Sequence, residues 1–112
     1  MYEQKVRTIS FDDLQKKIKA GEKFTLADAR SREDYDKSHL PGAISVPAED
    51  VRDNAGRLDK NSEIITYCGS FQCPASTMAA KEFMGIGFKN VLDYKGGIQE
   101  WTEKGQPTER SR

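Results

Sequence analysis

The sequence predicts an α/β fold in which helices cover both faces of a mainly parallel sheet. Two sequence patterns lead to this prediction. Short apolar runs of strand length alternate along the whole chain with stretches that have the periodicity of amphipathic helices. This alternation is typical of a parallel sheet whose strands are buried on both faces. With 112 residues, the chain is long enough to bury one such core and too short for two.

In the first half of the chain, residues with known capping preferences mark the expected elements. Ser10 and Asp13 form an acidic variant of a capping box and Gly21 supplies a stop, so a helix is expected between them. Residues 24–29 (FTLADA) are a buried strand, and Ser31 caps a short acidic helix. The remaining expectations are a turn at 39–43 (HLPGA), a brief strand at 43–47 and a polar surface helix at 48–58.

The second half of the chain contains the most apolar strand, residues 63–67 (EIITY), which leads directly into a cysteine. Pro74 suits the first turn of a helix over 74–87, because the N–H that proline lacks has no partner there in any case. A strand at 90–94 and a short final helix at 96–105 complete the alternating order.

Composition gives the expected surroundings and partners. The 18 basic and 18 acidic residues cancel, so charge gives no reason to expect a nucleic acid or a membrane as a partner. No stretch approaches the ~20 apolar residues of a membrane span, and the start of the chain has no apolar run that could serve as a signal peptide. We therefore expect a cytoplasmic monomer, with a single domain over residues 1–107, a polar tail over 108–112 and fraying from residue 106 onward.

Both cysteines lie in the short loop between the strand at 63–67 and the helix at 74–87. Because permanent disulfides are rare in a reducing compartment, the pair is expected to be chemically active rather than structural. Cys68 lies at the carboxyl end of a strand and before a helix N-terminus, a position that favours a thiolate and an anion nest of backbone N–H groups. The alternative is that Cys68 is a small buried hydrophobic residue. The expected substrate-binding loop consists of Gly69, Ser70, Phe71, Gln72 and Cys73.

Other cysteine chemistries fit this loop less well. A thioredoxin-like centre has two residues between its cysteines, whereas four separate them here. Two cysteines and the distant His39 fall short of a zinc site, so no metal or other cofactor is expected. A Cys/His hydrolase would need His39 near Cys68, yet His39 lies in a predicted turn. A phosphatase loop would need an arginine at its far end, and no Lys or Arg lies between Cys68 and Lys81.

Three separated motifs resemble the single-domain rhodanese family of cysteine-persulfide sulfurtransferases, in the family's order and spacing. They are LADARSREDYDKSHLPGAISVP (26–47), EIITYC (63–68) and GFKNVLDYKGGIQEW (87–101). The resemblance implies a rhodanese-like doubly wound sheet of about five mainly parallel strands. It also implies that Cys68 takes sulfane sulfur as a persulfide and passes it to a thiol or another nucleophile. The six-residue loop has the length found in the family's sulfurtransferases, one residue shorter than in its phosphatase and arsenate-reductase relatives.

The loop departs from family members that use thiosulfate, which commonly carry basic residues where this chain has Gly69 and Cys73. Phe71 and Gln72 give the rim a neutral, partly apolar character. We therefore expect an organic persulfide, a polysulfide or a partner protein's thiol rather than thiosulfate. Three interpretations of Cys73 stay open: a small buried residue, a resolving thiol that forms a disulfide with Cys68, or a thiol that protects Cys68 from irreversible oxidation.

Asp28 and Arg30 resemble the family's acid and base at a strand end, and are expected to support the loops near the site through an ion pair. The alternative is a surface pair worth less than ~1 kcal/mol. Arg32 and Lys95 are secondary candidates for the basic functions that the loop lacks. Two other functions stay open for the whole domain: a non-catalytic binding or regulatory module with the rhodanese fold, and a cysteine redox sensor.

Overall fold

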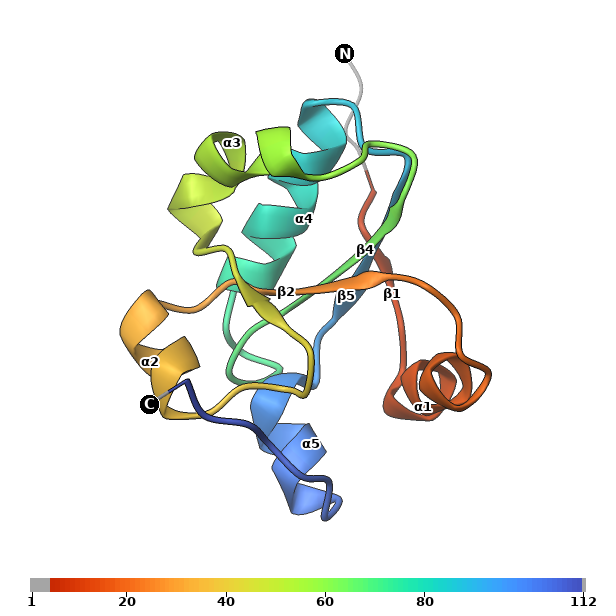
Figure 1. Ribbon diagram of the computed structural model, residues 1–112, viewed down its shortest axis with the longest axis vertical. Helices are drawn as coiled ribbons and strands as arrows, with labels where there is room; N and C mark the ends of the chain where they lie inside the picture. The colour runs from red at the N-terminus through yellow and green to blue at the C-terminus, as the bar shows by residue number, and fades with distance from the viewer. Residues whose placement is uncertain (1–4, 112) are drawn as a thin grey trace.

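One five-stranded parallel sheet forms the centre of the protein (Figure 1). It is seen in a computed structural model that describes residues 5–111. The strand order is β1-β5-β4-β2-β3, and every neighbouring pair is parallel. The predicted α/β class with about five mainly parallel strands is therefore confirmed. The strands are β1 (Arg7–Thr8), β2 (Thr25–Asp28), β3 (Ile44–Ser45), β4 (Glu63–Tyr67) and β5 (Asn90–Tyr94).

Helices cover both faces of the sheet. In Figure 1, α3 and α4 lie on one side of the strands, and α1 and α5 lie on the other. Within residues 5–111, none of the helices combines the length and the apolar character that crossing a membrane requires. The helices are α1 (Phe11–Lys19), α2 (Arg32–Lys37), α3 (Val51–Asn54), α4 (Ala75–Gly85) and α5 (Gly97–Glu103).

The two predicted serine caps are present. Ser10 Oγ accepts a hydrogen bond from the Asp13 N–H at 3.1 Å, and α1 begins at the next residue. Ser31 Oγ accepts from the Asp34 N–H at 3.1 Å at the start of α2. In each case the hydroxyl provides a partner for an N–H that the first helical turn leaves without one, which is why these positions were predictable from the sequence.

The stretch 48–58 differs from the single polar helix that we predicted. It consists of α3 between two 3₁₀ turns, Ala48–Asp50 and Ala55–Arg57. One side of the stretch is polar and the other is buried. Val51 on the buried side is 1 % exposed and lies in the core cluster that α4 also contributes to. The helical character of the stretch was predicted, and its division and buried side were not.

Alternating residues of β4 point to the two faces of the sheet. Ile64 lies in the core cluster that includes Phe83 of α4, whereas Ile65 and Tyr67 lie in the opposite cluster with Trp101 of α5. Both faces are buried, which explains why the strand reads as a continuous apolar run. The strand ends at the carboxyl edge of the sheet, immediately before Cys68.

The end of the chain is ordered as far as residue 111, so the predicted fraying is wrong for the described part of the tail. His39 and Glu109 exchange two backbone hydrogen bonds of 2.9 Å each. Trp101 Nε1 donates to the Pro107 carbonyl oxygen at 2.7 Å, and the Ser111 N–H donates to the Asp36 carbonyl oxygen at 3.0 Å. The partners His39 and Asp36 lie far away in the sequence, and the polar composition of the tail gave no sign of them.

Candidate functional site

The loop of residues 68–73 connects β4 to α4 at the carboxyl edge of the sheet. Cys68 is 1 % exposed, while Phe71 is 57 % exposed. Gln72 is also exposed, and Gly69, Ser70 and Cys73 are intermediate. The Cys73 N–H donates to the Ser70 carbonyl oxygen at 3.1 Å, so it closes a turn within the loop. That the other N–H groups of the loop point toward the Cys68 sulfur and form an anion nest stays a prediction.

Cys68 and Cys73 are joined by a disulfide. Their Cα atoms lie 6.4 Å apart, within the ~4.4–6.8 Å that disulfides require. The structure therefore describes an oxidised form of the loop, in which neither cysteine is a free thiol. The disulfide joins the two cysteines that the sequence placed in one loop. Cys73 is therefore not simply a small residue buried in the core.

The start of α5 holds the Cys68 end of the loop through backbone contacts. The Ile98 N–H donates to the Cys68 carbonyl oxygen at 3.0 Å, and the Gln99 N–H donates to the Gly69 carbonyl oxygen at 2.9 Å. Gly97 has φ +63°, and a Cβ at this position would lie 2.9 Å from the Cys68 carbonyl carbon. A glycine is required here both by the positive φ and by the close approach of the two backbones.

A second set of contacts holds the Cys73 end of the loop. Lys95 Nζ donates to the Cys73 carbonyl oxygen at 3.2 Å and to Thr77 Oγ1 at 3.2 Å. Thr77 Oγ1 in turn donates to Asp93 Oδ2 at 2.8 Å. Asp93 is fully buried, on the face of β5 that α4 covers. The loop is thus held at one end by α5 and at the other by Lys95, which follows β5 and also bonds to Thr77 of α4.

Asp28 and Arg30 form the ion pair that was expected, and it is not a surface pair. Arg30 Nη2 lies 2.7 Å from Asp28 Oδ2 and Arg30 Nε lies 3.0 Å from Asp28 Oδ1. The side chain of Asp28 is fully buried and that of Arg30 is 14 % exposed. Arg30 Nη2 also donates to the Ser38 carbonyl oxygen at 2.6 Å, which connects the end of β2 to the turn after α2.

Tyr67 connects this ion pair to the strand that carries Cys68. Its hydroxyl donates to Asp28 Oδ2 at 2.9 Å and accepts from the Leu40 N–H at 3.0 Å. Burial first, and then the negative charge of Asp28, raise the pKa of Tyr67 above its ordinary value of 10.0. The phenol therefore stays protonated and available as a donor. Since Tyr67 is the last residue of β4, these contacts fix the backbone immediately before Cys68.

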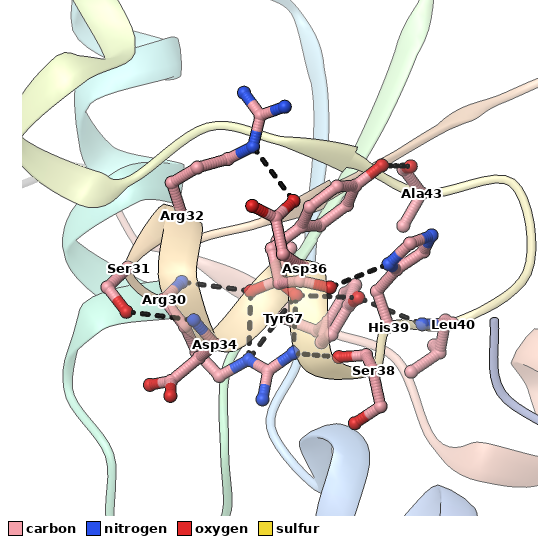
Figure 2. Close-up of polar contacts among 12 residues, drawn as sticks. Arg30, Ser31, Arg32, Asp34, Asp36, Ser38, His39, Leu40, Ala43 and Tyr67 are labelled. Atoms are coloured by element: carbon pink, nitrogen blue, oxygen red, sulfur yellow. Dashed lines mark hydrogen bonds and ion pairs between the residues drawn. The ribbon is translucent and has the colours of Figure 1, made fainter. Parts of the chain in front are cut away.

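Two residues considered in the sequence have other partners. Arg32 pairs with Asp36 at 3.0 Å on the exposed side of α2, as Figure 2 shows, so it does not replace a basic residue of the loop. His39 is buried and stacks on Tyr35 with ring centroids 3.9 Å apart, and its Nδ1 lies 2.8 Å from the Tyr35 carbonyl oxygen. These contacts agree with a structural role for His39 in its turn.

Sequence reasoning missed Tyr67, Thr77 and Asp93. A signal for one of them was present: Asp93 is a polar residue inside a short apolar strand, at a position that faces a helix. A buried carboxylate needs partners, so it could have prompted a search for them. The signal for Tyr67 was weaker, since tyrosine is common in strands for packing alone.

An open groove with a volume of about 350 Å³ adjoins the loop. Phe71 and Phe11 give it apolar walls, while Lys95 and Glu100 supply charges. Another hollow of about 350 Å³, lined by residues that include Ile18 and Trp101, touches no residue of the loop. The groove beside Phe71 is therefore the better candidate for a molecule that reacts at the loop.

Comparison with known proteins agrees with this fold. The family model for the rhodanese-like domain matches residues 10–104, which confirms the resemblance found in the sequence. The BH2092 protein of Bacillus halodurans has a crystal structure that superimposes with a TM-score of 0.87 at 34% identity. That match covers 94% of this chain and 77% of the other.

Several curated relatives have names that refer to sulfur, and two of them are compared below. The candidate sulfur carrier protein YrkF of Bacillus subtilis is 34% identical over 96 residues, covering 86% of this chain and 51% of the relative. The thiosulfate sulfurtransferase GlpE of Coxiella burnetii is 25% identical over 76 residues, covering 68% of this chain and 69% of the relative. The chain thus spans about half the length of YrkF and a larger share of GlpE.

Proposed function

Because the chain belongs to the rhodanese-like domain family, we propose that it transfers sulfane sulfur through a persulfide on Cys68. The observation that supports this most strongly is the place of Cys68, at the carboxyl end of β4 in a six-residue loop that leads into α4. A helix N-terminus stabilises a negative charge beside it, and both a thiolate and a persulfide are anions.

The reaction has two half-reactions through one covalent intermediate. The Cys68 thiolate attacks the outer sulfur of a persulfide donor, so a new S–S bond forms and the donor leaves as a thiolate. An acceptor thiolate then attacks the outer sulfur on Cys68, takes it as a new persulfide and restores the Cys68 thiolate. Such a sequence gives ping-pong kinetics. The disulfide form must first be reduced by a dithiol, since Cys68 is not free in it.

The loop favours an organic persulfide over thiosulfate as the donor. None of its six residues is Lys or Arg, and the exposed Phe71 forms part of the adjoining groove. A small dianion would lose water there and gain no arginine fork, whereas a donor with carbon groups can bury them against Phe71 and Phe11. A persulfide on a small thiol or on a partner protein's cysteine has this character.

Cys73 acts in this proposal as a resolving thiol. Its thiolate attacks Sγ of the Cys68 persulfide, the bond between Sγ and the outer sulfur breaks, and the outer sulfur leaves as hydrosulfide. The product is the Cys68–Cys73 disulfide, and a dithiol reductant returns it to two thiols. The observed disulfide supports this role, because it shows that the loop accommodates a bond between the two sulfur atoms, with the Cα atoms 6.4 Å apart.

Steady-state kinetics with the reduced protein test the proposal. Wild type, Cys68→Ser and Cys73→Ser are compared with glutathione persulfide and with thiosulfate as donors, and with a thiol or cyanide as acceptor. We expect the wild type to transfer sulfur from glutathione persulfide faster than from thiosulfate. We expect Cys68→Ser to transfer none. Cys73→Ser is expected to keep transfer and to lose hydrosulfide release without an acceptor. Equal turnover of both donors would refute the proposed substrate class, and transfer by Cys68→Ser would refute the proposed mechanism.

A second candidate function, a cysteine redox sensor, is favoured by the same disulfide. A sensor would form this bond under mild peroxide and would not accumulate a persulfide from any donor. The two functions are separated by treating the reduced protein with each reagent in turn. Disulfide formation by peroxide without persulfide loading would favour the sensor over the transferase.

A further inference from the structure

A cluster of buried polar side chains lies beneath the first turn of α4. Asp93 on β5 and Thr66 on β4 are neighbours in the sheet, and both are fully buried on the face that α4 covers. Thr66 Oγ1 lies 3.0 Å from the Ser76 carbonyl oxygen and 3.4 Å from Asp93 Oδ1. A buried carboxylate is costly unless hydrogen bonds and an opposite charge compensate it, so the surroundings of Asp93 should contain both.

Lys95 provides the opposite charge, acting through Thr77. The Thr77 hydroxyl donates to Asp93 Oδ2 at 2.8 Å and accepts from Lys95 Nζ at 3.2 Å. The same ammonium group donates to the Cys73 carbonyl oxygen at 3.2 Å. A chain of hydrogen bonds therefore runs from the buried carboxylate to the residue that we propose as the resolving thiol.

We propose that Lys95 is a positioning residue, which holds the Cys73 end of the loop and supplies the positive charge that stabilises the Cys73 thiolate. This inference rests on the proposed role of Cys73. The six-residue loop contains no Lys or Arg, and the sequence left open which residue supplies a positive charge there. The cation comes instead from the residue after β5, and Asp93 and Thr77 fix its place.

The physical basis is the short distance between the ammonium group and Cys73. Lys95 Nζ lies 3.2 Å from the carbonyl oxygen of Cys73, and a positive charge near a thiol favours the charged form of that thiol. The charged groups that face Lys95 are Asp93, through Thr77, and Glu100, which lines the same groove. Their negative charges offset part of the effect. We therefore expect a change of less than a full pKa unit.

The first experiment measures Cys73 alone and uses no sulfur donor. In a Cys68→Ser background, the rate of Cys73 alkylation by iodoacetamide is followed against pH with Lys95 intact and with Lys95→Met. Lys95→Met is expected to raise the apparent pKa of Cys73 and to slow alkylation near pH 7 by about threefold, which corresponds to half a pKa unit. Lys95→Arg is expected to restore most of the rate, because it keeps the charge.

Lys89→Met is the matched control, because it removes the same charge from an exposed lysine immediately before β5. The alkylation rate of Cys73 in this variant should depend on pH as it does in the Cys68→Ser protein with Lys89 intact. Thr77→Val is a second test of the same chain of contacts. It should shift the pH dependence of Cys73 alkylation in the same direction as Lys95→Met does. Thermal unfolding verifies that each variant is folded. An unchanged profile in folded Lys95→Met would overturn the inference.

A second experiment separates this inference from the proposed function. The otherwise wild-type protein is loaded with glutathione persulfide, and hydrosulfide release is followed over time with Lys95 intact and with Lys95→Met. Release is expected to slow about threefold in Lys95→Met, the same factor as alkylation. If no variant loads sulfur, the proposed function fails while the alkylation result still decides the role of Lys95. Equal release rates in both loaded proteins would contradict the inference.

Discussion

Gly97 offers the sharpest test of how α5 holds the loop. Its φ is +63°, and an added Cβ would lie 2.9 Å from the Cys68 carbonyl carbon and 3.0 Å from the Gly69 carbonyl carbon. Backbone atoms cannot move aside as a flexible side chain can. We therefore expect Gly97→Ala to push the start of α5 away from the loop, and to weaken the hydrogen bonds that Cys68 and Gly69 accept from it.

The magnitude follows from two contributions. A residue with a Cβ in the left-handed region costs about 1–2 kcal/mol relative to glycine. The two hydrogen bonds from α5, at 3.0 and 2.9 Å, contribute about 0.5–1.5 kcal/mol each. Gly97→Ala should therefore lower the free energy of unfolding by about 2–5 kcal/mol, depending on how far α5 moves.

Gly105→Ala is the matched control for this measurement. Gly105 has φ +78°, and a Cβ there would meet nothing within 4 Å, so only the left-handed strain of about 1–2 kcal/mol applies. Urea unfolding of both variants in the same redox state compares the two losses directly. Equal losses would refute the argument that α5 approaches the loop too closely for a side chain. A larger loss in Gly97→Ala, accompanied by slower persulfide loading, is the expected result.

The buried contacts around Asp28 give three further predictions. Arg30→Met should lower the free energy of unfolding by about 3–5 kcal/mol, because the carboxylate of Asp28 stays buried without its partner. Arg52→Met, which breaks an exposed pair, should cost at most about 1 kcal/mol in the same urea titration, and similar losses would contradict the account. Tyr67→Phe should cost about 1–3 kcal/mol by thermal unfolding, since it leaves a buried N–H without a partner, and an unchanged Tm would count against the role of that hydroxyl. Burial raises the pKa of Tyr67, so the contribution of its protonated phenol to the free energy of unfolding is complete below pH 10. This contribution is lost as the pH rises above 10, and the fall in stability there should be shallower in Tyr67→Phe.

The parts of the fold that depend on local signals were predictable from the sequence. The strand at 63–67 is apolar at successive positions because both faces of the sheet are covered, and Pro74 marks the helix that follows. The caps at Ser10 and Ser31 bond to N–H groups three residues away. The serine caps act within one helical turn, Pro74 directly precedes its helix, and the strand shows its burial in its own residues.

The parts that depend on distant partners were not predictable. β1 is a two-residue edge strand whose residues are exposed, so it has no apolar pattern, and it exists because β5 is available beside it. Glu109 pairs with His39 across 70 positions of sequence, and polar composition at a chain end normally indicates disorder. Lys95 was recognised only as a secondary candidate, because its contact with Cys73 depends on how the loop curls.

The central claim of the account is that Cys68 carries sulfane sulfur. The most direct test is a peptide mass spectrum of the reduced protein after treatment with glutathione persulfide and capping of free thiols. Cys73→Ser is used so that the persulfide cannot be resolved within the loop. We predict a gain of about 32 Da, the mass of one sulfur atom, on the peptide that contains Cys68. A folded protein whose Cys68 peptide gains no mass under these conditions would contradict the claim, and would favour a binding module or a redox sensor built on the same fold.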